Sequence, residues 1–174
     1  EYIKYTINSI LSVDGSAVIY LATDQNINFK NVNIIDLRSI ESNQSKNIKD
    51  LDIYKDTIFE KNSLWLTSLL RIFYLRDIKK ELGLSEIIHF DNDVLIYKPF
   101  EKYKICLDEN RFNITPANKF RFIFGFSYVS NLLIFDELCK RLENLLIEGS
   151  NSNWNFNNSI PPNEMDLLGM LYEK

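Results

Sequence analysis

Apolar residues recur along the chain with two kinds of spacing. Steps of three and four residues, as in Ile3, Ile7 and Ile10, are typical of helices, whereas short runs rich in β-branched residues are typical of buried strands. The first kind predicts helices over 2–11, 64–82 and 136–147 and another opening at 163–166, and the second predicts strands over 17–22, 32–37, 87–90, 94–97, 112–115 and 128–135. The polar, aperiodic stretches 41–50 and 149–159 predict loops, and the second is a candidate lid over a bound ligand.

This alternation of strands and helices is typical of an α/β domain with a largely parallel sheet flanked by helices. Ser63 is expected to cap the helix that starts at Leu64, and Gly83 to end it. In such sheets ligands bind outside the carboxyl ends of the strands, so the residues that follow the strand 87–90 become site candidates.

Composition narrows the class of protein. The chain has 174 residues, of which 45% are hydrophobic, so one domain with a substantial core is expected over 1–174. A formal net charge of only -4 does not favour nucleic acid as a partner.

Targeting signals and cysteines in the sequence indicate the cellular compartment in which the protein is expected. No apolar run approaches the roughly 20 residues of a membrane-spanning helix, and the first residues lack the basic start and apolar stretch of a signal peptide. We therefore expect a cytoplasmic protein, with peripheral contact at the inner face of the membrane left open. Cys106 and Cys139 lack metal-ligand spacing, and free thiols in a reducing compartment are expected.

The acidic pair Asp91 and Asp93 directly follows an apolar strand. Burying two carboxylates there is costly without a partner, and Mg²⁺ or Mn²⁺ shared with substrate phosphates would supply one. The competing interpretation is an ordinary surface turn. An EF-hand calcium loop is excluded because Ile96 stands where that loop requires glycine. A phosphatase that forms an aspartyl-phosphate would require Thr or Val at the position of Leu95, so it is a weaker rival.

Arg71 lies in the middle of a helical segment that is apolar on nearly every side. A buried guanidinium is rarely left without an anion, and its fork suits a carboxylate or a phosphate. Ser68 and Thr67 lie three and four residues before it, on the same face. The alternative to a ligand-binding role is a salt bridge from Arg71 to Asp91 or Asp93, and both roles can coexist.

The order Ser68-Leu69-Leu70-Arg71, then an apolar strand, then Asp91-Asn92-Asp93 resembles the GT-A glycosyltransferases, and most closely their retaining family 8. The resemblance implies a GT-A (Rossmann-like) fold, a UDP-sugar or similar nucleotide diphosphate sugar as donor, and Mn²⁺ or Mg²⁺ as cofactor. It implies that Asp91 and Asp93 bind the metal, and that Ser68, Arg71, Asp91 and Asn92 contact the donor.

Two further segments are similar to this family. The run 129–135 resembles a later strand that contacts the sugar, although it lacks the family's glycine, and 164–168 resembles an acidic segment that places Glu164 or Asp166 by the anomeric carbon. The family's first strand and its C-terminal metal-binding histidine have no counterpart here, so the resemblance implies a domain shortened at both ends. His89, the one histidine, is expected to be a packed core residue rather than a ligand.

The resulting expectation is metal-dependent transfer of a hexose to a hydroxyl of a glycan or glycolipid. The alternative from another class is a non-catalytic glycosyltransferase-like remnant.

Overall fold

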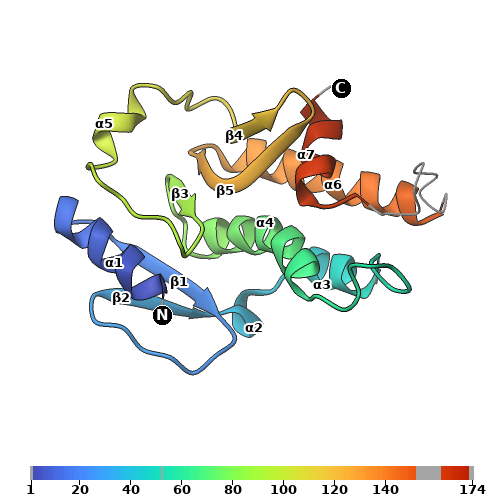
Figure 1. Cartoon of the computed structure of the whole chain (residues 1–174), viewed down its shortest axis with the longest axis horizontal. Helices are drawn as coiled ribbons and strands as arrows, with labels where there is room; N and C mark the ends of the chain where they lie inside the picture. Colours follow the sequence, from blue (N-terminus) through green and yellow to red (C-terminus); the bar gives the residue numbers. More distant parts are fainter. Residues whose placement is uncertain (1, 52, 152–161, 173–174) are drawn as a thin grey trace.

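The computed structural model describes residues 2–51, 53–151 and 162–172. Within these residues the helices and strands follow one another along the chain in this order: α1 (Tyr2–Val13), β1 (Ile19–Thr23), β2 (Val32–Asp36), α2 (Leu37–Ile40), α3 (Asn43–Asp50), α4 (Leu64–Glu81), β3 (Ile87–Phe90), α5 (Glu101–Lys104), β4 (Asn113–Asn118), β5 (Arg121–Val129), α6 (Leu132–Asn151) and α7 (Glu164–Tyr172). The protein is therefore of the α/β class, as the sequence predicts (Figure 1).

The strands form two small sheets. Strands β1 and β2 are parallel, with Ile19 opposite Val32, whereas β3 and β4 both run antiparallel to the central strand β5. The expectation of one largely parallel sheet is wrong for the described residues. The reason is local: β4 and β5 are joined by a tight connection after Asn118, and a connection that short can only return the chain antiparallel.

Four predicted segments differ from the structure. The predicted strand over 128–135 is divided, because β5 ends at Val129 and α6 begins at Leu132, where the Asn131 side chain accepts a hydrogen bond from the Leu133 amide at 2.9 Å. Residues 94–97 follow β3 without forming a strand, and 41–50 contains α3 instead of a loop. Part of the predicted loop, 149–151, continues α6, and the lid candidate over 152–159 lies outside the described residues.

Helix α4 spans almost the residues predicted for it, but a different side chain caps its N-terminus. Gly83 has a φ of +59°, a left-handed conformation that ends the helix as expected. Ser63, however, makes no capping hydrogen bond, and the Asn62 side chain accepts from the Leu64 amide instead, at 3.0 Å.

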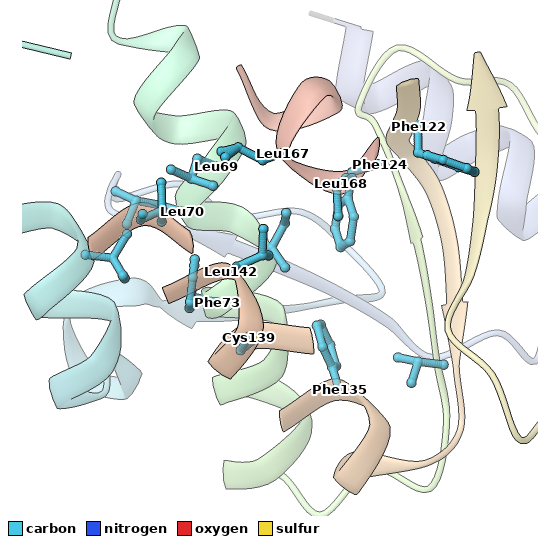
Figure 2. Close-up of a cluster of buried hydrophobic side chains, with 14 residues drawn as sticks. Leu69, Leu70, Phe73, Phe122, Phe124, Phe135, Cys139, Leu142, Leu167 and Leu168 are labelled. Carbon is cyan, nitrogen blue, oxygen red and sulfur yellow. The ribbon is translucent and has the colours of Figure 1, made fainter. Parts of the chain in front are cut away.

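The core lies where α4, α6 and α7 pack together and against β5 (Figure 2). Leucines and aromatic residues from all four elements fill it, among them Leu69, Phe73, Phe124, Phe135, Leu142 and Leu167, each with no exposed surface. Burying each of these side chains stabilises the fold by about 1.5–3 kcal/mol. This packing fixes α4 and α7 relative to β5.

A buried polar network attaches α3 to α4. The Asp77 carboxylate accepts hydrogen bonds from the Ser45 hydroxyl at 2.6 Å and from the Ser42 amide at 3.1 Å. Arg76 reaches Asp77 and, on α6, Asp136. Docking through polar groups explains why the sequence of α3 shows no apolar stripe.

No helix in the described ranges has the length and apolarity needed to cross a bilayer.

Candidate functional site

Strand β3 delivers the acidic turn to the edge of the antiparallel sheet. The Asp91 amide donates to the carbonyl of Gly125 on β5 at 2.9 Å, which extends the pairing of the two strands by one residue. The chain then turns, and the Val94 amide donates back to the Asp91 carbonyl at 3.2 Å. The position of Asp91 is therefore set by the sheet and not by a free loop.

Helix α1 holds the same turn from the other side. The Thr6 hydroxyl donates to the Asn92 carbonyl at 2.8 Å, and the Ile96 amide donates to the Ser9 hydroxyl oxygen at 2.9 Å. Thr6 is buried, which partly shields its contact with Asn92 from water. Two elements more than 80 residues apart thus fix the backbone of the turn.

Arg71 joins the turn to the last helix. Its Nη1 contacts the Asp91 carboxylate, and its Nη2 donates to both carboxylate oxygens of Glu164, at 2.9 and 3.1 Å. Glu164 is nearly buried, with its side chain 7% exposed, whereas the side chains of Arg71 and Asp91 are 24% and 35% exposed. The cluster therefore has a buried end at Glu164 and an accessible end at Asp91.

The buried environment shifts the protonation of these groups. Burial raises the pKa of Glu164, and the Arg71 guanidinium counteracts part of that rise. Contact with the Arg71 guanidinium lowers the pKa of Asp91. The Arg71 guanidinium contacts Asp91 and Glu164, and Asp93 lies in the same turn as Asp91. When all four groups are ionised, one positive and three negative charges give the cluster a formal charge of -2.

His89 is a packed residue, as expected, but it also faces the site. Its ring lies 5.3 Å from the ring of Phe124, and its Nε2 lies 3.7 Å from the Asp91 carboxylate, too far for a hydrogen bond. Burial lowers the pKa of the imidazole, which favours its neutral form. In the described part of the chain, His89 Nε2 and Arg71 Nε are buried polar atoms that have no hydrogen-bond partner.

Gly125 makes room for the Asp91 carboxylate. A Cβ atom at this position would lie 2.5 Å from Asp91 Oδ2, closer than real Cβ atoms come, and 3.2 Å from its Cγ. Any other residue would therefore displace the carboxylate or the strand. The glycine interrupts an aromatic run, Phe122-Ile123-Phe124-Gly125-Phe126, and an isolated glycine within a strand is a signal of close approach that sequence reasoning missed.

The other predicted site residues are placed as follows. Asn92 and Asp93 are exposed in the turn, and Ser68 is half-buried one helical turn before Arg71. Asp166 does not join the Arg71 cluster. It lies 2.8 Å from Arg121 Nε and accepts from the Asn163 amide at the start of α7.

The residues fit a divalent cation only as a shared site. In the ranges that the structure describes, no group of three or more His, Cys, Asp or Glu side chains is arranged to hold a metal. Asp91 and Asp93 supply two carboxylates on one turn, and Mg²⁺ or Mn²⁺ commonly takes one or two carboxylates and completes its shell with water and substrate phosphates. The donor set suits such an ion in the presence of a phosphate ligand.

The polar anchors on α1 were also missed from the sequence. Thr6 and Ser9 lie three residues apart and so face the same way, but their partners lie far along the chain, and no local signal identifies them.

No protein-family model, no curated protein and no solved structure matches this chain. The resemblance to glycosyltransferases therefore depends on the motif and its surroundings alone.

Proposed function

We propose that the turn 91–93, Arg71 and Glu164 form the donor site of a metal-dependent hexosyltransferase with a GT-A fold. It would transfer the sugar of a nucleotide diphosphate sugar, such as a UDP-sugar, to a hydroxyl of a glycan or glycolipid. By the family 8 resemblance, the anomeric configuration would be retained.

The observation that carries this proposal is the convergence of Arg71, Asp91 and Glu164. They come from α4, from the end of β3 and from the start of α7, and they lie 20 and 93 residues apart along the chain. The resemblance implies that Arg71 contacts the donor, and the contact of Arg71 with Asp91 supports a place for it beside the acidic turn. A position at the end of an apolar strand, accessible on the Asp91 side, is suited to a ligand.

Each group has a role in this proposal. Asp91 and Asp93 would hold Mn²⁺ or Mg²⁺, which when bound stabilises negative charge on the departing diphosphate. Arg71 would contact a phosphate oxygen through the part of its fork that faces Asp91. Glu164 orients Arg71 from the buried side, and it is a better candidate than Asp166 for a place near the reacting sugar because Asp166 pairs with Arg121.

Binding of UDP tests this proposal directly. Isothermal titration with and without Mn²⁺ is performed on the wild type, on Asp93→Ala, and on Asp50→Ala as a control for an exposed carboxylate at the end of α3. We expect UDP binding that requires Mn²⁺, is retained in the control and is lost in Asp93→Ala. Equal affinity in all conditions would refute the metal diphosphate site.

One observation favours the second candidate, a non-catalytic remnant. Arg71 already has two protein carboxylates as partners, so the cluster is a salt bridge that holds α4, β3 and α7 together without any ligand. Assay of donor hydrolysis separates the two functions, because a competent site transfers sugar slowly to water and a remnant does not. Turnover of an aryl phosphate in the same assay would instead support the phosphatase.

A further inference from the structure

The segment that follows the acidic turn presents apolar side chains to solvent. We define the 95–105 surface by its exposed members, which are the apolar residues Leu95, Tyr97, Tyr103 and Ile105 and the charged residues Lys98, Glu101 and Lys102. We infer that the 95–105 surface docks the protein onto the headgroup region of an anionic lipid bilayer. This inference does not depend on the proposed transferase activity.

The exposure of these side chains is the first argument. Ile105 is 88% exposed, Tyr97 77%, Leu95 46% and Tyr103 42%, all within eleven consecutive residues. Single exposed apolar residues are ordinary, whereas a concentration of them marks an interaction surface. Figure 1 shows this segment, with α5, as a strap along one margin of the molecule, away from α6 and α7.

The strap is anchored, so its outward side chains are held in place. At one end the Ile96 amide bonds to Ser9 on α1. Farther along, the ring of Phe100 lies 5.6 Å from that of Tyr128, and Lys104 Nζ lies 2.9 Å from Glu86. Residues of the segment that have partners point inward, and the apolar residues between them remain in solvent.

Charge and residue type favour a lipid surface over a protein partner. Lys104 is paired with Glu86, so the exposed charged residues Lys98, Glu101 and Lys102 give this surface a local charge of +1 in a chain whose net charge is -4. Lysine is depleted at protein–protein interfaces. At a bilayer surface, lysines are attracted by anionic headgroups while tyrosines sit at the headgroup level and aliphatic side chains enter the acyl boundary. Lys98 and Lys102 flank the aromatic residues in the way that such a surface favours.

Vesicle flotation tests the inference. The 174-residue chain is mixed with vesicles of phosphatidylcholine alone, or of phosphatidylcholine with phosphatidylglycerol, at low salt. We expect binding to the anionic vesicles only, because each lysine near such a surface strengthens binding about fivefold. Lys98→Glu/Lys102→Glu should therefore weaken binding by about 25-fold or more, and Tyr97→Ser/Ile105→Ser should also weaken it strongly.

Leu133→Ser is the matched control, since Leu133 on α6 is 77% exposed and lies outside the 95–105 surface. It should bind like the wild type, and the circular dichroism and thermal unfolding of every variant confirm that each is folded. Absence of wild-type binding to anionic vesicles would overturn the inference, as would equal binding by the charge-reversed variant. Concentration-dependent self-association that Tyr97→Ser/Ile105→Ser abolishes, without vesicle binding, would assign the surface to a second copy instead.

Discussion

The ion pair between Arg71 and Glu164 should stabilise the fold more than any pair on the surface. We consider Arg71→Met, which keeps the length of the side chain and removes the guanidinium, alone and combined with Glu164→Gln. The comparison pair is Arg121 and Asp166, which also joins α7 to its neighbours.

The expected loss of stability follows from how deeply each ion pair is buried. The Glu164 side chain is 7% exposed and accepts two hydrogen bonds from Arg71, whereas the side chains of Arg121 and Asp166 are 39% and 35% exposed. Removing one partner of a buried pair costs about 3–5 kcal/mol, and partial exposure of Arg71 places its cost at about 3 kcal/mol. Exposed pairs contribute below about 1 kcal/mol, so Arg121→Met should cost no more than that.

A double-mutant cycle isolates the interaction. In the Glu164→Gln background the ion pair left to lose is the part-exposed one between Arg71 and Asp91, so Arg71→Met should cost about 1 kcal/mol. The coupling energy is then about 2 kcal/mol. Urea unfolding followed by circular dichroism measures the free energy of unfolding of each variant at neutral pH. A coupling energy below about 0.5 kcal/mol, or equal costs for Arg71→Met and Arg121→Met, would refute the reasoning.

The loss of stability caused by Arg71→Met should depend on pH. Burial raises the pKa of Glu164 and Arg71 opposes that rise, so Arg71→Met raises the pKa further. A carboxyl with a higher pKa in the folded than in the unfolded protein stabilises the fold when protonated, and this stabilisation is lost as pH rises through the folded pKa. The cost of Arg71→Met should therefore shrink as the pH is lowered from neutral to mildly acidic values. In the Glu164→Gln background this dependence should disappear.

Two further outcomes are expected. Gly125→Ala should lower the affinity for UDP with Mn²⁺ by about tenfold or more, roughly 1.4 kcal/mol, because the new Cβ displaces the Asp91 carboxylate. Gly15→Ala is the control: the atom nearest to its new Cβ lies 3.9 Å away, so the UDP affinity measured by isothermal titration should not change. Cys106 is exposed and should react with a thiol reagent at once, whereas Cys139 is fully buried, with a pKa raised by burial to about 12, and should react only as fast as the protein unfolds. Simultaneous labelling of both thiols would contradict this.

The helices that contribute apolar side chains to the core could be predicted from the sequence, and those that dock through polar groups could not. The extent of α4 follows from its apolar residues and from Gly83. Helix α3 was predicted as a loop, since its one fully buried apolar residue is Ile48 and its other fully buried residue is Ser45, which binds Asp77. Hydrophobic periodicity contains no information about such contacts.

Strand pairing was the weakest part of the prediction for a related reason. The apolar residues over 128–135 belong partly to β5 and partly to α6, and an apolar run of that length has no periodicity that separates a strand from a buried helix. The direction of the strands depends on their connections, and the tight return from β4 to β5 made the sheet around β3 antiparallel.

The candidate site illustrates what a buried arginine does and does not predict. Its position in an apolar helix requires an anion, and Asp91 was one of the partners that the sequence offered. Nothing local indicated that Glu164 would be the second partner, because that contact depends on how α7 packs on β5.

The second partner also changes the expected electrostatics of ligand binding. Arg71 alone would attract a diphosphate, but Arg71 between Asp91 and Glu164, with Asp93 in the adjacent turn, lies in a region of formal charge -2. Such a region repels a diphosphate that arrives without a cation and attracts one that is neutralised by a divalent ion. If the cluster is a donor site, a divalent ion should therefore increase the affinity for UDP much more than it would at a site with Arg71 alone. Glu164→Gln removes one negative charge, so in this variant the ion should increase the affinity for UDP less.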